Sequence, residues 1–371
     1  MVAGLLLSQT ACSNRWITVL PLGHCLAANY QRWLSNSRID VEALYGPMVL
    51  WAIQHLQKPG QAMHQAHYTT MLWNRGCIVV ISVICNGRAM PLPWKARDQP
   101  SASVSASVSI ALLEKAEQLL IGFGAITLLA DRAFPYDLPV AWFAARSRWS
   151  YVMRLRGGTE IHGTAAPLGC QVRRLHLQRG ECRGFRNVRL WADGTQTVNM
   201  VLPHPTGLPV EEPWILISSA EPSLDLVWSY AQRFWCEQLF RDQKSGVFQL
   251  ESSGLREPER IDRLLLVVVI AVLVGSLQGY TLSLAGLRRQ VDPHWKRGMS
   301  FLWIGLAALQ MAVADVTARL MAWLPIPIHE LEPCILSRKA SRRHAQAWFS
   351  RVELPPRPRS ATDHTPLLVV T

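Results

Sequence analysis

The sequence lacks the residue patterns of a zinc-stabilised or exported protein. Its eight cysteines form no C-x-x-C pair and no cysteine–histidine spacing typical of a zinc site, which excludes zinc fingers and ribbons. The first residues carry no positive segment before their short apolar run, so we expect no export signal, free thiols and a reducing cytoplasm. Acidic residues are also scarce. With 26 against 38 basic residues, the net charge of +12 disfavours acidic partners and favours a polyanion, either nucleic acid or an anionic membrane.

Long apolar runs are nearly absent too. The one candidate, Leu264–Leu287, holds no charged residue and is long enough to span a bilayer. Its strictly apolar part, Leu264–Val274, covers only eleven residues, and polar residues interrupt the remainder: Ser276, Gln278, Thr281 and Ser283. We therefore predict a buried core helix and no membrane association, with a membrane protein built around this segment as the alternative.

What is present is enough for a folded protein of about two domains. The 371 residues are 49% hydrophobic and 17% charged, a composition that excludes disorder, collagen and coiled coils. Hydrophobic periodicity and turn residues predict these elements in order: strands over 66–72, 77–85 and 88–94, a helix near 111–120, a strand over 125–130, a helix over 136–146 and a strand over 150–155. An Asn86-Gly87 turn joins the second and third strands. The first three strands are expected to be antiparallel and the later ones to arrive by crossovers, which makes the fold α/β.

The regions around this α/β unit differ in composition. Residues 1–60 have a helical pattern, and their basic stretch, Gln31–Arg38, is a candidate DNA contact. Residues 157–215 are rich in Gly, Pro and short alternating runs, which predicts a β-rich insertion. Residues 216–330 return to apolar helical patterns. The tail, 331–371, is basic and Pro-rich, and we expect it to be disordered from Leu354 onwards.

Arginine is concentrated around the predicted insertion. Between Arg146 and Arg189 the sequence has ten arginines against two acidic residues, with aromatic residues interleaved. Charge of one sign combined with aromatics is typical of surfaces that contact phosphates and stack on bases, although a solvated basic face is the alternative. We predict nucleic-acid binding here. The candidate contacts are Arg154, Arg156, Arg173 and Arg174.

Residues that could carry chemistry occur at two places. Asp131 follows the apolar strand at 125–130, where α/β sheets present ligands, although Asp is also a common helix N-cap. Tyr230, Arg233, Glu237 and Lys244 follow at intervals of three, four and seven residues. On an α-helix these intervals place them within roughly a 60° arc. A surface ladder of ion pairs is the alternative, but the intervening residues are apolar, and a polar stripe on a buried helix needs a partner such as phosphate or a metal ion.

The spacing Y-x2-R-x3-E-x6-K, with a strand ending in Asp-Arg and a basic β-rich insertion, resembles the DDE transposases of bacterial insertion sequences. The resemblance is to their Y-R-E-K subgroup, typified by insertion sequence four. The stretch Thr69-Thr-Met-Leu-Trp-Asn-Arg similarly resembles that family's first catalytic strand, and the resemblance extends from about Gln31 to about Gln310. It implies a ribonuclease-H-like mixed sheet flanked by helices, with core parts at 61–156 and 216–330, interrupted by the β-rich insertion and preceded by the N-terminal helical region.

In that family three carboxylates, two on strands and one on the later helix, hold two Mg²⁺ ions. The resemblance implies that Asp131 and Glu237 are the second and third of these catalytic metal ligands. It also implies that Tyr230, Arg233 and Lys244 grip the terminal phosphates of the transposon end. The implied reaction is in-line attack on a DNA phosphodiester, first by water and then by a freed 3′-hydroxyl. The implied partners are terminal inverted repeats, target DNA and a second copy in a synaptic dimer, at the nucleoid of a bacterial cytoplasm.

The sequence departs from the family at the first carboxylate, because Tyr68 stands where the family has Asp. No acidic residue lies between Glu42 and Asp98 to replace it. A neutral phenol with a pKa of about 10 supplies neither the charge nor the bidentate oxygens that two Mg²⁺ ions need, and on a strand His67 points to the opposite face. We therefore predict a transposase by architecture whose catalysis is impaired. The alternative is an inactive DNA-binding remnant that occupies transposon ends.

Overall fold

The computed structural model describes residues 1–12, 15–16, 23–56, 62–85, 88–132, 134, 142–146, 148–191, 196–208, 210–314, 338 and 348–356. The chain divides into two compact units. The first consists of Met1–Met153 and Ser229–Ala345, and the second of Arg154–Trp228 and Gln346–Thr371. The second unit therefore combines the central β-rich segment with the C-terminal end of the chain.

Five strands of the first unit form a mixed sheet in the order β3-β2-β1-β4-β5. The first three are antiparallel neighbours: β1 (Met63–Leu72), β2 (Gly76–Cys85) and β3 (Arg88–Asp98). The other two, β4 (Ile126–Ala130) and β5 (Trp149–Arg154), run parallel to β1. This order, with three antiparallel strands followed by two parallel ones, is the ribonuclease-H-like arrangement, so the predicted fold class is confirmed.

Local sequence explains why the strands form where they do. β2 is apolar along nearly its whole length because it is buried throughout, between β1 and β3. It is joined to β1 by a three-residue turn, Trp73–Arg75, in which Trp73 and Asn74 have φ of 49° and 56°, the left-handed backbone typical of tight hairpin turns. The predicted Asn86-Gly87 turn lies outside the described residues, as does most of the helix expected over 136–146.

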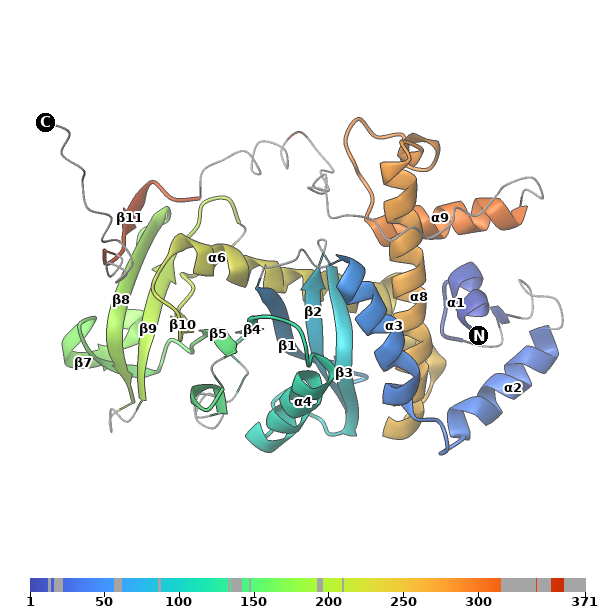
Figure 1. Cartoon of the computed structure of the whole chain (residues 1–371), viewed down its shortest axis with the longest axis horizontal. Coiled ribbons are helices and arrows are strands. Elements are labelled where there is room, and N and C mark those ends of the chain that lie inside the picture. Colours follow the sequence, from blue (N-terminus) through green and yellow to red (C-terminus); the bar gives the residue numbers. More distant parts are fainter. Residues whose placement is uncertain are drawn as a thin grey trace, which may run out of the picture. The chain divides into compact units, whose positions relative to one another are not determined.

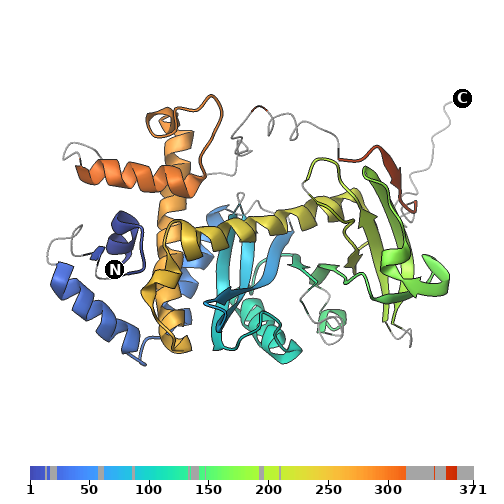
Figure 2. The same ribbon diagram turned by 180° about the vertical axis from the view of Figure 1, so that it is seen from behind.

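Helices cover both faces of this sheet (Figures 1 and 2). On one face, α4 (Ala106–Leu119) packs on β2 and β3, and its Ser109 contacts His67 of β1. On the opposite face, α7 (Trp235–Arg241) packs on β1 and β3, and the neighbouring residue of β1, Tyr68, contacts Phe240 of that helix. Since successive strand residues point to opposite faces, the prediction that His67 points away from the face of Tyr68 is confirmed.

β3 is the last strand at one edge of the sheet, and helices rather than a further strand pack along it. Tyr45 of α3 (Val41–Leu56) packs edge-on against Trp94 at 5.3 Å between ring centroids. Asp262, near the start of α8 (Pro258–Leu284), accepts a hydrogen bond of 2.7 Å from the backbone N–H of Ala96. It also forms an ion pair of 3.0 Å with Lys95. A carboxylate thus satisfies a donor at the strand edge that would otherwise invite pairing with a further strand.

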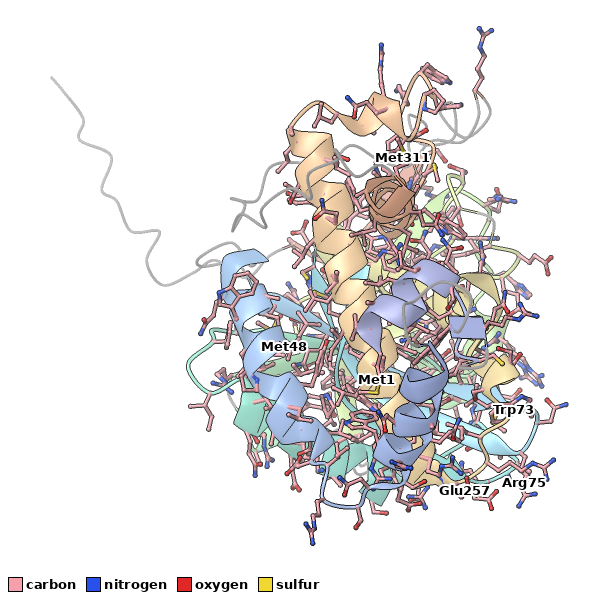
Figure 3. All side chains as sticks on the ribbon, turned by 90° about the vertical axis from the view of Figure 1, so that its right-hand side faces the viewer. Met1, Met48, Trp73, Arg75, Glu257 and Met311 are labelled. Carbon is pink, nitrogen blue, oxygen red and sulfur yellow. The ribbon has the colours of Figure 1, made fainter. Side chains whose placement is uncertain are left out.

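The long apolar helix α8 lies at the centre of a helical layer beside the sheet. Figure 3 shows it between α3 on one side and α1 (Val2–Ser8) and α2 (Gly23–Ser35) on the other, and α9 (Phe301–Ala314) crosses it closely. By length and composition α8 could span a membrane, but 78% of its most apolar window is buried within the fold. We therefore treat α8 as the core helix that the polar interruptions in its sequence predicted.

The second unit is built mainly of antiparallel strands. Their order is β10-β9-β8-β6-β7: β10 (Leu216–Ser218), β9 (Gln196–Pro203), β8 (Glu181–Leu190), β6 (Glu160–Gly163) and β7 (Ala166–Gln171). A short C-terminal strand, β11 (Arg351–Glu353), pairs in parallel with β8. The first residues of the segment expected to be disordered, 354–356, follow β11 without regular structure. Gly184 of β8 lacks a side chain where Leu354 and Pro355 pack, so these residues have a site to occupy.

Candidate carboxylate site

Asp131 immediately follows β4, at the carboxyl end of a strand that runs parallel to β1. The backbone turns there, since the N–H of Phe134 donates to the Asp131 carbonyl at 3.0 Å. The Asp131 side chain is 40% exposed. The parallel pairing aligns His67 with Ala130, so the next residue on each strand, Tyr68 and Asp131, occupies the adjacent position at this end of the sheet.

The segment that carries Tyr230, Arg233, Glu237 and Lys244 is not one regular helix. It consists of α6 (Leu224–Ala231), a 3-10 turn at Gln232–Phe234, α7 and a π-helical turn at Asp242–Gly246. The prediction that all four residues follow an even 100° spacing is therefore wrong. The 3-10 turn tightens the winding before α7 and the π-helical turn widens it afterwards, so Lys244 no longer follows the α-helical register of Glu237.

The four residues consequently have different surroundings. Tyr230 is completely buried, Arg233 is buried, and Glu237 is exposed. Lys244 forms an ion pair of 3.4 Å with Glu251. The sequence did not predict this partner of Lys244, because nothing in its spacing reveals where the chain turns after the π-helical segment.

Asp131 and Glu237 are brought together by Arg233. The Arg233 guanidinium places Nη1 3.7 Å from Oδ2 of Asp131 and Nη2 3.3 Å from Oε1 of Glu237. The Arg233 side chain is only 8% exposed, whereas those of Asp131 and Glu237 are 40% and 54% exposed. Burial acts to lower the pKa of Arg233, but the surrounding Tyr230 and acidic groups outweigh it and raise the pKa, so this cation is permanent.

Tyr68 is part of the core rather than of a polar cleft. Its hydroxyl lies 2.7 Å from Oγ of Ser82, and its ring meets Phe240 edge-on at 4.4 Å between centroids. The side chain is 5% exposed, and burial raises the pKa of the phenol well above its usual value. Tyr68 is therefore neutral at physiological pH.

These residues do not fit a two-metal centre. Both available carboxylates already face the Arg233 guanidinium, and the third position holds the neutral phenol of Tyr68. Within the described part of the chain, no three His, Cys, Asp or Glu side chains group closely enough to hold a metal ion. Divalent Mg²⁺ takes carboxylate and water oxygens, and a guanidinium between two carboxylates repels it.

A second buried ion pair, which no pattern in the sequence indicates, fixes the π-helical turn. Arg88 at the start of β3 donates to Oδ2 of Asp242 at 2.5 Å and to Oγ of Ser300 at 2.7 Å. The Asp242 carbonyl also accepts the backbone N–H groups of Val247 and Phe248. One charged residue from a strand thus holds the turn that follows α7, which positions the helix carrying Glu237.

The arginine-rich region carries less free positive charge than its sequence suggested. Acidic residues from outside the segment neutralise part of it: Glu353 pairs with Arg183 at 3.4 Å and Glu221 with Arg186 at 2.5 Å. A count along the sequence could not include these partners, because they arrive from distant parts of the chain. Of the predicted contacts, Arg156, Arg173 and Arg174 are exposed and Arg154 is partly buried.

Comparisons with known proteins add little to this geometry. No family model matches the chain, and no curated protein matches it. Among solved structures, it is similar to a piggyBac transposase in a synaptic complex with hairpin DNA, at 12% identity and a TM-score of 0.38, over 74% of this chain and 57% of that one. It is also similar to the catalytic domain of human endonuclease V, at 13% identity and a TM-score of 0.27, over 66% of this chain and 97% of that one. Such weak similarities do not assign a function, so the fold class rests on the strand order.

Proposed function

We propose that this protein is a DNA transposase of the insertion-sequence lineage, of the Y-R-E-K type, which cleaves and joins DNA phosphodiesters at transposon ends with impaired activity. The observation that carries the proposal is the convergence of Asp131, after β4, with Glu237, on α7, beside the position that Tyr68 holds on β1. A ribonuclease-H-like sheet offers carboxylates of a phosphodiester-cleaving site at these three places. In this chain two of the three are acidic.

Positive charge supports DNA as the partner. The chain has a net charge of +12, and exposed arginines lie on the second unit at Arg156, Arg173 and Arg174. Phosphate contacts of this kind contribute affinity without reading the sequence, and they need no metal ion. Binding to transposon ends and target DNA, and pairing of two copies at those ends, are further parts of the proposal, as is a location at the nucleoid of a bacterial cytoplasm.

The main alternative, a DNA-binding remnant with no catalysis at all, is favoured by Tyr68. A first carboxylate is absent, and the residue in its place is buried, neutral and hydrogen-bonded to Ser82. Charge neutralisation at phosphorus supplies much of the rate in phosphoryl transfer, so an incomplete carboxylate set costs orders of magnitude.

Two assays on the same protein separate these possibilities. An electrophoretic mobility shift with duplex DNA, with and without Mg²⁺, measures binding, and conversion of supercoiled plasmid to nicked circles measures cleavage. We expect a shift that does not depend on Mg²⁺ and only slow, Mg²⁺-dependent nicking by the unaltered protein, whereas the remnant would give the same shift and no nicking. Absence of any DNA shift at low salt would refute the proposed function.

Variants at residue 68 then test the cause of the impairment. Tyr68→Asp restores the carboxylate, and Tyr68→Phe is the matched control because it removes the hydroxyl without adding charge. We expect nicking to become faster with Tyr68→Asp only. If the unaltered protein nicks DNA as fast as the Asp variant, the impairment is wrong, and if neither nicks, the remnant alternative stands.

A further inference from the structure

We propose that the loop between α8 and α9 is a further DNA-binding surface, which stacks Trp295 on an unpaired base and places basic side chains beside the adjoining phosphates. This loop, residues 285–300, follows the end of α8 that extends past the sheet (Figure 1). It has four Lys or Arg against one acidic residue. The inference rests on the proposed function in taking DNA as the partner, and it adds a contact to bases that the arginine-rich region does not supply.

The one acidic residue of the loop, Asp292, fixes the loop's backbone. Its side chain is only 3% exposed. The carboxylate accepts the backbone N–H groups of His294, Gly298 and Met299 at 3.3, 2.8 and 3.2 Å, and Arg288 adds an ion pair of 3.3 Å. One buried carboxylate thus closes the loop and holds it in a single conformation, so little conformational entropy is lost when a ligand binds there.

Trp295 is exposed although the same loop packs other apolar side chains inward. Its side chain is 51% exposed, whereas Leu287, Val291 and Met299 pack against the apolar cluster that includes Phe301. The loop therefore directs this one large ring away from the core. A single exposed ring is common on protein surfaces, so the charges around Trp295 decide its role.

Positive charge surrounds the exposed ring. The Lys296 ammonium lies 5.2 Å from the centroid of the Trp295 ring, and Arg289 is exposed. The other two basic residues, Arg288 and Arg297, bond to groups within the loop. An aromatic ring beside cations is the combination with which proteins bind single-stranded nucleic acid, because a base stacks on the ring while the cations contact its phosphates.

An anionic membrane is the other partner that a tryptophan beside cations would fit. A segment that enters a bilayer surface presents a broad apolar face together with its basic residues. Of residues 284–300, only Leu284 and Trp295 are large, apolar and exposed. One ring on a loop and one side chain at a helix end do not make such a face, so an unpaired base fits this surface better than a lipid layer does.

Fluorescence anisotropy with two labelled DNAs tests the contact. One is a perfect duplex, and the other is the same duplex with an internal run of unpaired thymines. The proteins compared are the unaltered chain, Trp295→Ala, Trp295→Phe and Trp51→Ala. Trp51→Ala is the matched control, because Trp51 is 42% exposed on α3 and is flanked along the chain by the apolar residues Leu50 and Ala52.

We expect the unaltered protein to prefer the DNA with unpaired bases. Trp295→Ala should bind that DNA about tenfold more weakly, the usual effect of losing one base–aromatic stack, and should bind the perfect duplex with less than about a twofold change. Trp295→Phe keeps an aromatic ring and should retain most of the preference. Trp51→Ala should retain all of it.

Failure of this inference is distinguishable from failure of the proposed function. If the unaltered protein binds both DNAs equally, or if Trp295→Ala changes both affinities alike or neither, the loop contact is refuted while DNA binding stands. If the unaltered protein binds neither DNA, both proposals fail. Sedimentation with phosphatidylglycerol vesicles tests the membrane: vesicle binding that Trp295→Ala abolishes, without a preference for unpaired bases, would overturn the inference in favour of a lipid surface.

Discussion

At the scale of single residues, the surroundings of Tyr68 show how this fold is stable with a neutral side chain at the position where the proposed lineage has a carboxylate. A carboxylate at the end of a buried strand must be paired or hydrated to stay charged. A tyrosine needs neither, because its ring fills the space against Phe240 and its hydroxyl is satisfied by Ser82. A tyrosine at this position therefore favours folding and contributes no negative charge to the site.

Two substitutions at this residue should separate packing from charge. Tyr68→Phe leaves the Ser82 hydroxyl buried without its partner, which costs about 1–3 kcal/mol of unfolding free energy. Tyr68→Asp removes the ring as well and places a carboxylate in the core, so we expect a loss of about 3–5 kcal/mol or more. Urea denaturation followed by circular dichroism measures both. Equal stability of the Asp and Phe variants would show that Tyr68 is not part of the core.

His67, on the other face of β1, should make the free energy of unfolding depend on pH. Burial lowers the pKa of His67 to about 4 against the opposing effect of Asp131, and its Nε2 lies 3.1 Å from Oγ of Ser109. The unfolded chain, with a pKa of about 6.5, binds the proton more readily. The contribution of neutral His67 to stability is therefore complete above about pH 6.5 and is lost as the pH falls towards 4, by roughly 3 kcal/mol at most.

Comparison with His67→Asn isolates this contribution, because other groups titrate in the same range. Asparagine keeps a polar group near Ser109 but does not titrate. We expect the unfolding free energy of the unaltered protein to fall more steeply between pH 6.5 and pH 4.5 than that of the variant. Parallel pH profiles would contradict the assignment.

At the scale of elements, the sequence predicted what local patterning controls. The runs at 66–72, 77–85 and 88–94 and the short turns between them predicted the strands and their antiparallel pairing, because both depend on residues close in the chain. The spacing of the polar residues from Tyr230 to Lys244 predicted a helical segment correctly. It did not predict that this segment contains a 3-10 turn and a π-helical turn. Its π-helical turn depends on Arg88, which reaches Asp242 from the start of β3, a tertiary contact that no helical periodicity encodes.

In the carboxylate site, too, the sequence indicated the individual residues but not the contacts between distant elements. Asp131 at a strand end was visible in the sequence, and so was Glu237 on the later helix. That Arg233 forms ion pairs with both of them was not visible. It depends on how α7 crosses the sheet, and that crossing is set by packing such as that of Phe240 on Tyr68.

The C-terminal strand β11 pairs with β8, and the residues that follow it pack closely against Gly184 of β8. A Cβ at Gly184 would lie 2.7 Å from Leu354, so Gly184→Val should displace the segment that contains β11. We expect trypsin to cleave after Arg351 at least tenfold faster in this variant. Gly158→Ala is the control, since a Cβ there meets nothing within 4 Å. Equal cleavage rates in both variants would mean that the strand does not depend on this contact.

At the scale of the whole molecule, the distribution of charge matters more than its sum. Part of the arginine in the second unit is neutralised internally, as Arg183 is by Glu181 and Glu353, while Arg173 and Arg174 are exposed. Only arginines that reach solvent release counterions when they meet a phosphate. The proposed DNA affinity should therefore depend on a few of the ten arginines of this region and not on the net charge of +12.

The salt dependence of DNA binding measures this difference. For duplex DNA the slope of log K against log salt concentration becomes shallower by about 0.9 for each phosphate that the protein no longer neutralises. Arg173→Ala with Arg174→Ala should reduce the slope by up to about 1.8, whereas Arg183→Ala, which removes an internally paired charge, should leave the slope nearly unchanged. Fluorescence anisotropy with a labelled duplex at several salt concentrations gives both slopes. If each arginine removed changes the slope equally, DNA senses only net charge, and Arg173 and Arg174 do not form a distinct contact surface.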